Sequence, residues 1–184
     1  MTTPTNPLNY LPQRMQSDRL QYPGLLPDET LVLRAWLKIN EAQFDRFDYN
    51  VRIGPAYVSK VPLSPDVQRN ANLLHQLRLD AVGWKGVDNS LLPYSIEHPS
   101  EVYAVFPSAA ATIIDAKRRA TNAAIGQVLT YRDNWMSENP QCVTPDLLIV
   151  CATYAPNIVP SLLAAQIQLN TVSPDFSLLR NKKP

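Results

Sequence analysis

Several features that define common classes of protein are scarce in this chain of 184 residues. Its two cysteines, Cys142 and Cys151, have neither the spacing of a metal site nor the number that a disulfide framework needs. With five glycines, the chain has no Gly-rich phosphate loop, and it has no Ser or Cys nucleophile motif. His75 and His98 have no partners at metal-binding spacing. We therefore expect two free thiols in a reducing compartment.

Strong charge and long apolar runs are also missing. The net charge is +1, so the chain as a whole does not attract nucleic acid, and its local basic groups are small. No apolar run is long enough to span a bilayer. The first residues, MTTPTNPLNYLPQR, lack the basic start and apolar centre of a secretory signal. We expect a protein that is neither secreted nor bound to a membrane.

Proline is the residue in excess, with 17 copies, and it gathers at the ends of the chain and in two internal stretches. This distribution predicts an extended arm at 1–26, one domain at 27–171 with an insertion at about 85–108, and a tail at 172–184. Proline stiffens the backbone and removes hydrogen-bond donors. We therefore expect the arms to lie on other chains rather than fold back over their own sheet, with apolar anchors at Tyr10, Leu11, Leu20, Tyr22 and Phe176.

The hydrophobic periodicity of the central part predicts an α/β domain with a mixed sheet flanked by helices. Pro27, followed by two acids, predicts the start of a helix that ends at Asn40. An apolar run at 147–152 is typical of a strand buried on both faces. The other predicted elements are strands at 47–53, 76–84 and 112–117, a helix at about 123–136, a last helix from Pro160 to about Leu169, and an optional strand at 101–106.

The stretch 112–135 carries the chemistry-bearing residues. On a strand, alternate side chains share a face, so Asp115 and Lys117 are neighbours. The next helix carries Gln127 and Tyr131 four positions apart, on one face. Asp80 lies on an earlier predicted strand, where alternation places it on the opposite face from Leu79 and Ala81. An acid and a lysine at the end of an apolar strand, followed by this Gln-Tyr pair, favour phosphodiester chemistry.

Together, Asp80, Asp115, Lys117, Gln127 and Tyr131 resemble the restriction-endonuclease-like, or PD-(D/E)xK, nuclease superfamily. The resemblance is strongest to the branch with a Gln-x-x-x-Tyr helix, and it covers roughly 27–171. The chain is also similar to phage and prophage proteins that carry this motif set. The resemblance implies a restriction-endonuclease-like core. Leu79 stands where the motif has proline, and Asp115 stands where glutamate is more common.

Hydrolysis of a phosphodiester needs a metal-held hydroxide and neutralisation of the charge on the pentavalent phosphate. Carboxylates are the hard oxygen ligands that Mg²⁺ or Mn²⁺ takes. The resemblance then implies a role for each matching residue: Asp80, Asp115 and the carbonyl of Ala116 as metal ligands, Lys117 as the group that offsets charge, Gln127 and Tyr131 as assisting residues, and Glu29 of the first helix as an additional acid that binds the metal. Arg118 and Arg119 beside this set are candidates for holding DNA phosphates.

Simpler interpretations stand beside these. An Asp-x-Lys pair alone is more typical of a surface ion pair, and Gln127 and Tyr131 form a plausible hydrogen-bonded pair between helix and sheet. Two functions follow from the sequence. The first is a Mg²⁺-dependent phage nuclease that acts on DNA. The second is a catalytically silent virion component, such as a neck, connector, tail or baseplate protein. Such a component would contact other phage structural proteins or its own copies through the arms. The expected location is the virion or the host cytoplasm.

Overall fold

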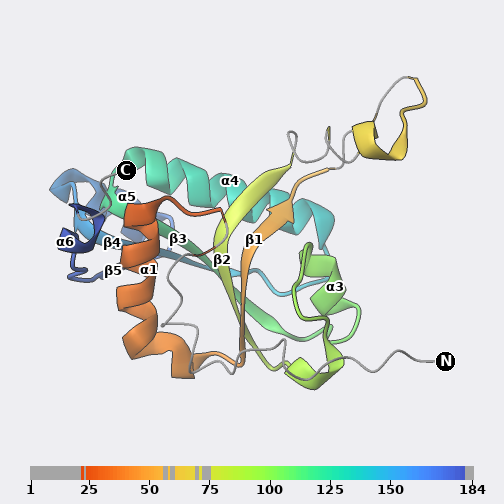
Figure 1. Cartoon of the computed structure of the whole chain (residues 1–184), viewed down its shortest axis with the longest axis horizontal. Coiled ribbons are helices and arrows are strands. Elements are labelled where there is room, and N and C mark those ends of the chain that lie inside the picture. Colours follow the sequence, from red (N-terminus) through yellow and green to blue (C-terminus); the bar gives the residue numbers. More distant parts are fainter. Residues whose placement is uncertain are drawn as a thin grey trace.

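The computed structural model describes residues 22, 24–55, 58, 61–68, 71 and 76–180. Its helices and strands are labelled in Figure 1. They are α1 (Pro27–Asn40), β1 (Arg46–Ile53), β2 (Leu77–Lys85), α3 (Pro99–Tyr103), β3 (Ala110–Ala120), α4 (Asn122–Glu138), β4 (Asp146–Tyr154), α5 (Val159–Ala164), β5 (Ile167–Thr171) and α6 (Ser177–Arg180).

The five strands form one mixed sheet in the order β1-β2-β3-β4-β5. The first three strands run antiparallel, whereas β3, β4 and β5 are parallel. A parallel pair needs a crossover connection, and α4 supplies it between β3 and β4. The predicted α/β class with a mixed, helix-flanked sheet is therefore confirmed.

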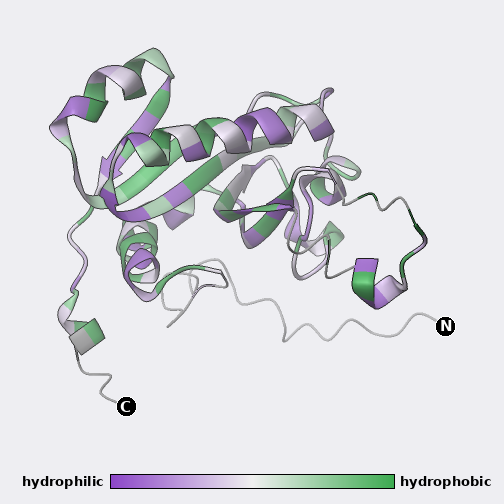
Figure 2. Ribbon diagram, turned by 90° about the horizontal axis from the view of Figure 1, so that it is seen from above, coloured by the Kyte–Doolittle hydropathy of each residue, from purple (hydrophilic) through white to green (hydrophobic). Residues whose placement is uncertain are grey.

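Helices cover both faces of the sheet, as the view from above shows (Figure 2). One core lies under α1, where Leu33 and Trp36 pack with Ile114 of β3. The other lies under α4, where Val128 packs with Ile113. Neighbouring residues of β3 thus face opposite layers, as strand alternation predicts. Residues 147–151 of β4 are all buried, which confirms the prediction of a strand covered on both faces.

The optional strand at 101–106 is wrong, because Pro99–Tyr103 forms the short helix α3. Pro99 stands at the first helical position, where its missing N–H costs nothing. Glu101 Oε1 accepts hydrogen bonds from the backbone N–H groups of Glu97 and His98, both at 2.8 Å. This N-terminal cap outweighs the strand preference of the valine and tyrosine that follow.

The predicted last helix is also wrong in its second half. The helix α5 ends at Ala164, and Gln166 takes a left-handed backbone conformation with φ 57°. This conformation ends a helix. The chain then continues as β5, which pairs in parallel with β4 from Leu147↔Ile167 to Cys151↔Thr171. The strand β3 likewise runs three residues past its predicted end, because Arg119 and Ala120 still pair with β4.

The proline-rich insertion lies along the outer edge of β1. Arg46 of β1 anchors it there. The Arg46 guanidinium is buried in an ion pair within β1, with Nε 2.6 Å from Asp48 Oδ2. The same guanidinium donates from Nη2 to the carbonyl oxygen of Pro93 at 2.8 Å. Further along β1, the N–H of Arg52 donates to the carbonyl oxygen of Glu97 at 2.8 Å. The insertion therefore satisfies backbone groups of an edge strand that would otherwise be open.

Two of the expected arm anchors pack on their own domain. Tyr22 is fully buried, and its ring centroid lies 4.7 Å from that of Tyr49. At the other end, Phe176 packs against the core under α1, together with Val172. The expectation that Tyr22 and Phe176 anchor the arms on other chains is therefore wrong for these two residues. Tyr10, Leu11, Leu20 and His75 lie outside the described residues.

Within the described ranges, no helix combines the length and apolar character that crossing a bilayer requires.

Candidate active site

Three carboxylates converge on one lysine beside the middle of the sheet. Lys117 Nζ lies 2.9 Å from Asp115 Oδ1, 3.3 Å from Glu29 Oε1 and 3.5 Å from Asp80 Oδ2. The four residues come from β3, α1 and β2, and 88 positions separate Glu29 from Lys117. Each was a predicted site residue. The structure brings all four together.

A break in the strand pairing makes room for Asp80. The β2–β3 pairing reaches only to Ala81↔Ile114, so Asp80 lies just beyond it. The Asp80 carboxylate replaces the next strand contact, because Oδ2 accepts a hydrogen bond from the N–H of Ala116 at 2.9 Å. The carboxylate is thereby fixed against the backbone that follows Asp115.

Strand β1 is also irregular, at the position next to Asp80. The β1–β2 register passes from Tyr49↔Ala81 to Val51↔Leu79 without pairing the residues between them. The intervening residue of β1, Asn50, has a left-handed backbone with φ 58°. As a result Leu79 joins the core under α4, whereas Ala81 joins the core under α1. The expected face-sharing of Leu79 and Ala81 is therefore wrong, since simple alternation fails around Asp80.

Asp115 is the most deeply placed acid of the site, with a side chain that is 0% exposed. Burial raises the pKa of Asp115 to about 7, with a further contribution from the negative charge of Asp80, whereas the Lys117 ammonium opposes the rise. Neither carboxylate oxygen accepts a hydrogen bond of normal geometry from the described residues. Lys117 Nζ lies beside Oδ1, whereas Oδ2 has no donor among the described residues. A buried carboxylate oxygen without a donor is costly, and a bound cation would lower that cost.

The charge of Lys117 is strongly favoured. Burial by itself lowers the pKa of an ammonium, but the carboxylates of Asp115 and Asp80 outweigh it and hold the pKa of Lys117 above its ordinary value. Burial likewise raises the pKa of Asp80, although Lys117 and the Ala116 N–H oppose that effect. Lys117 is therefore a fixed cation at neutral pH and has no free electron pair with which to accept a proton.

Gln127 and Tyr131 lie on α4 and bond to each other, because Gln127 Nε2 donates to the Tyr131 hydroxyl oxygen. Burial raises the pKa of Tyr131 to about 12, and the charges of Asp115 and Asp80 contribute. The phenol is thus within electrostatic reach of the site. No hydrogen bond joins this pair to the site carboxylates within the described residues. Both the assisting role and the simpler packing role are compatible with this geometry.

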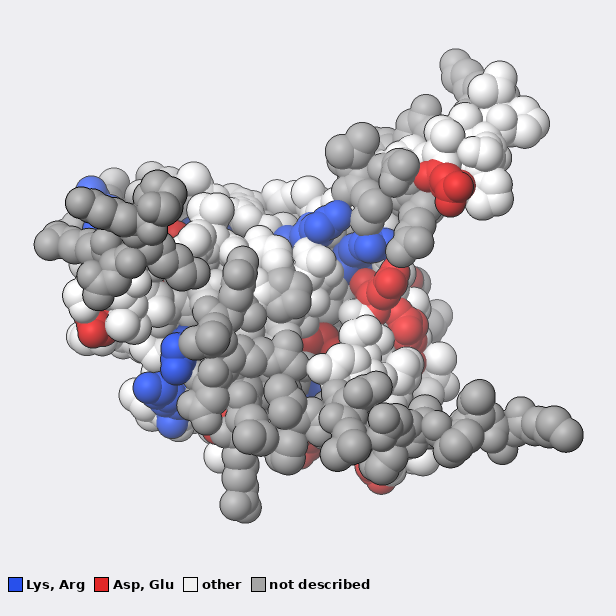
Figure 3. All heavy atoms as spheres, viewed as in Figure 1, with Lys and Arg blue, Asp and Glu red and all other residues white. Residues whose placement is uncertain are grey.

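The two arginines after Lys117 lie in different surroundings. Arg118 and Arg119 are both exposed. The guanidinium carbon of Arg118 lies 4.9 Å from the centroid of the Phe176 ring, a cation–π contact with the C-terminal segment. Alternation along β3 sends Arg119 to the opposite face. On the face shown in Figure 3, Lys and Arg form small separate groups rather than one broad basic surface.

The residues present have the chemistry of a site for a hard divalent cation. Asp115 offers Oδ2, which has no donor among the described residues, and Oδ1, which lies beside the Lys117 ammonium. Asp80 has a second oxygen, Oδ1, beside the one that Ala116 engages. Two carboxylates with a backbone carbonyl are ligands that Mg²⁺ or Mn²⁺ accepts. The described part of the chain holds no group of three or more His, Cys, Asp or Glu side chains arranged to bind a metal. A cation here would rest on Asp80, Asp115 and the Ala116 carbonyl, completed by water.

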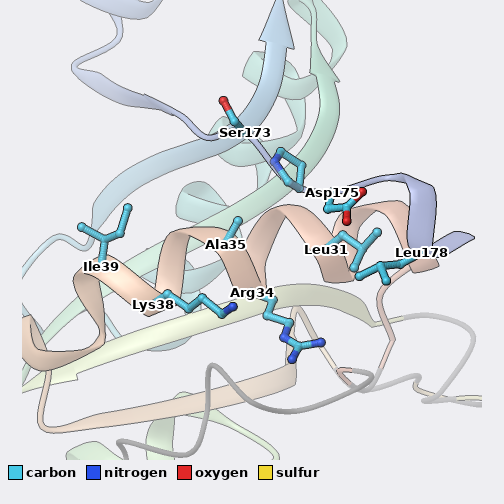
Figure 4. A pocket seen from close by; sticks show the side chains of 9 residues that line it. Leu31, Arg34, Ala35, Lys38, Ile39, Ser173, Asp175 and Leu178 are labelled. Atoms are coloured by element: carbon cyan, nitrogen blue, oxygen red, sulfur yellow. The ribbon is translucent and has the colours of Figure 1, made fainter.

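A surface groove lies away from these residues. It runs between the outer face of α1 and the segment 173–178, with Leu31, Ala35 and Leu178 on its apolar part (Figure 4). Arg34 and Lys38 of α1 extend along one side. None of the predicted site residues lines this groove.

Sequence reasoning missed the irregular Asn50, although a short polar residue that tolerates a left-handed backbone inside a strand pattern is a usable signal. It found Glu29 only through the family resemblance. The sequence also carried a local signal that Glu29 lies in the first turn of a helix, because a proline followed two positions later by glutamate is typical of a helix start.

No family model matches this chain, and no curated protein or solved structure matches it either.

Proposed function

We propose that the protein is a Mg²⁺- or Mn²⁺-dependent hydrolase of DNA phosphodiesters with a restriction-endonuclease-like core. The observation that carries the proposal is the convergence of Asp80, Asp115 and Lys117 at the interrupted edge between β2 and β3. The order of elements supports it too, since three antiparallel strands are followed by a helix and a parallel strand, as in the family that the motif resembles. The association with phages rests on the sequence resemblance.

In this proposal Asp80 and Asp115 hold the cation. The buried carboxylate of Asp115 favours this role, because Oδ2 has no hydrogen-bond donor among the described residues and Oδ1 has the Lys117 ammonium beside it. The Ala116 N–H keeps Asp80 in place through Oδ2. When bound, the cation lowers the pKa of a coordinated water and supplies the hydroxide that attacks phosphorus.

Lys117 stabilises the negative charge that develops on the phosphate oxygens as the new P–O bond forms and the bond to the leaving oxygen breaks. Its raised pKa makes it an electrostatic residue rather than the acceptor of the water's proton. That proton leaves to solvent or to the leaving oxygen. Arg119 and Arg118 lie next along β3 and are the nearest candidates to hold flanking phosphates.

The direct test is cleavage of linear, nicked and single-stranded DNA by the purified protein with Mg²⁺ or Mn²⁺. We expect Lys117→Ala and Asp115→Asn each to lower the rate by on the order of 100-fold or more. Lys38→Ala and Asp133→Asn remove the same charges from exposed positions and should leave the rate unchanged. A wild-type protein that cuts no DNA form with either metal would refute the proposal.

A second candidate is the catalytically silent virion module. The observation that favours it is electrostatic, because the net charge is +1 and the basic residues form small groups on the face in Figure 3. The burial of Tyr22 and the packing of the partly buried Phe176 on their own domain weaken the argument from the arms. Self-assembly of a protein that is inert towards DNA, measured by analytical ultracentrifugation, would favour this candidate.

A further inference from the structure

Both oxygens of the Glu29 carboxylate have a nitrogen donor nearby. Oε2 accepts a hydrogen bond from the N–H of Leu26 at 2.9 Å, which caps the first turn of α1. Oε1 lies 3.3 Å from Lys117 Nζ. The side chain is 14% exposed, so this carboxylate is fixed between the start of a helix and the site lysine.

These contacts argue against Glu29 as a metal ligand. An oxygen that already accepts a backbone hydrogen bond, as Oε2 of Glu29 does, gains less from a cation than an oxygen without one. Binding through Oε2 would also break the cap of α1. Among the described residues Glu29 does not form a metal-binding group with Asp80 and Asp115, although all three contact Lys117.

The contacts around Lys117 suggest what Glu29 does instead. An ammonium has three N–H donors, and three carboxylates surround this one. Without Glu29, the carboxylate partners of Lys117 among the described residues would be Asp115 and Asp80. The lysine would then compete with a cation for the same oxygens. Glu29 provides an attraction from the α1 side that holds the ammonium away from a position directly on the two aspartates.

We propose that Glu29 is a positioning residue that ties Lys117 to the N-terminus of α1, and that it is not a ligand of the cation. The inference rests on the proposed nuclease function, because it assigns Lys117 its place in that reaction. It also couples the site to a structural element, since any displacement of the first turn of α1 would move the lysine.

The test compares Glu29→Gln with Asp28→Asn. Glutamine keeps an oxygen that can accept from Leu26 N–H but loses the charge that attracts Lys117. Asp28→Asn removes one charge from the same helical turn at a residue whose Oδ1 accepts from the Glu29 N–H and does not contact Lys117. Asp80→Asn serves as the reference for the loss of a metal ligand.

Three measurements are made on each variant: kcat and KM for DNA cleavage, Mn²⁺ affinity by electron paramagnetic resonance, and the order of the Lys117 side chain by ¹³Cε relaxation. For Glu29→Gln we expect kcat to fall by roughly 10- to 100-fold, the range seen when a supporting partner of a site residue is lost. We expect KM and Mn²⁺ affinity to stay within about threefold of wild type, since no ligand is removed. The Lys117 side chain should become more mobile, and Asp28→Asn should show none of these changes.

Two results would overturn the inference. One is a loss of Mn²⁺ affinity in Glu29→Gln as large as in Asp80→Asn, which would make Glu29 a ligand. The other is an unchanged order of the Lys117 side chain, which would show that Glu29 does not hold it. A wild-type protein that cleaves no DNA refutes the proposed function itself, and this result is distinct from both, because the relaxation measurement needs no activity.

Discussion

The substitution Asp115→Asn should stabilise the metal-free protein while abolishing the proposed cleavage of DNA. Asp115 is fully buried, and its carboxylate oxygens receive no normal hydrogen bond from the described residues. Lys117, the cation beside it, retains Asp80 and Glu29 as partners after the substitution. The carboxylate therefore costs the fold more than an amide of the same shape would. This is the expected pattern at a site where function opposes stability.

The magnitude follows from the pKa. Asp115 titrates near 3.8 in the absence of its surroundings and at about 7 in the folded protein. Between these values the folded state binds the additional proton, so the contribution of Asp115 to stability is fully present below 3.8 and is lost as the pH rises through 7. At about 1.4 kcal/mol per pH unit, the loss reaches an upper limit of about 4 kcal/mol. A buried amide with unmet hydrogen bonds costs about 1–3 kcal/mol at every pH. The expected net gain above neutral pH is therefore about 1–3 kcal/mol.

Urea unfolding between about pH 4 and pH 8, in a chelating buffer, measures this difference. The advantage of the variant should be absent near pH 4, grow as the pH rises, and level off above about pH 7. Asp133→Asn, at a side chain that is 72% exposed, should show no such pH dependence. Adding Mn²⁺ at high pH should stabilise the wild type and leave Asp115→Asn unaffected. An Asp115→Asn protein that is less stable than wild type at high pH would show that the ion pair with Lys117 outweighs burial, and the reasoning would fail.

Other expected outcomes concern packing and buried charge, and each is measured as a change in the free energy of unfolding. A Cβ atom at Gly83 would lie 2.5 Å from the ring of Phe44, so Gly83→Ala should destabilise the fold by about 1–3 kcal/mol. Gly126, in the middle of α4, has nothing within 4 Å of such an atom, and Gly126→Ala should stabilise by about 0.5–1 kcal/mol. Arg46→Met leaves the carboxylate of Asp48 buried without its ion-pair partner and should cost about 3–5 kcal/mol.

Most of the fold could be predicted from the sequence, because the hydrophobic periodicity agreed with the residues that mark the ends of helices and strands. The helix Pro27–Asn40 has the predicted bounds, since a proline at its start and acids in its first turn reinforce the apolar face. The strand β5 escaped prediction because Ile167–Thr171 is short and follows directly on a helical stretch. Its partner β4 and the left-handed Gln166 decide its conformation, and neither influence is local to the five residues.

The sequence predicted which residues form the candidate site but not how the fold brings them together. The residue types and their spacing identified Asp80, Asp115 and Lys117, because a strand and the helix after it fix relative orientation. The contact of Glu29 with Lys117 spans 88 positions and depends on how α1 packs against β3. The hydrophobic periodicity of the sequence does not predict that packing. Alternation also misplaced the neighbours of Asp80, since it assumes a strand that stays paired throughout.

The irregularity around Asp80 is the feature that joins fold and function. In a regular sheet the N–H of Ala116 would donate to the backbone of the neighbouring strand, and the carboxylate of Asp80 would not accept from it. Here the β2–β3 pairing ends one residue earlier, and Asn50 on the far side of β2 takes a left-handed conformation that is rare for residues other than glycine. Backbone strain of about 1–3 kcal/mol persists only where the surroundings enforce it, and it concentrates at functional sites. The well-paired remainder of the sheet holds this conformation in place. The gap in the β2–β3 pairing allows both aspartates to reach one point beside Lys117.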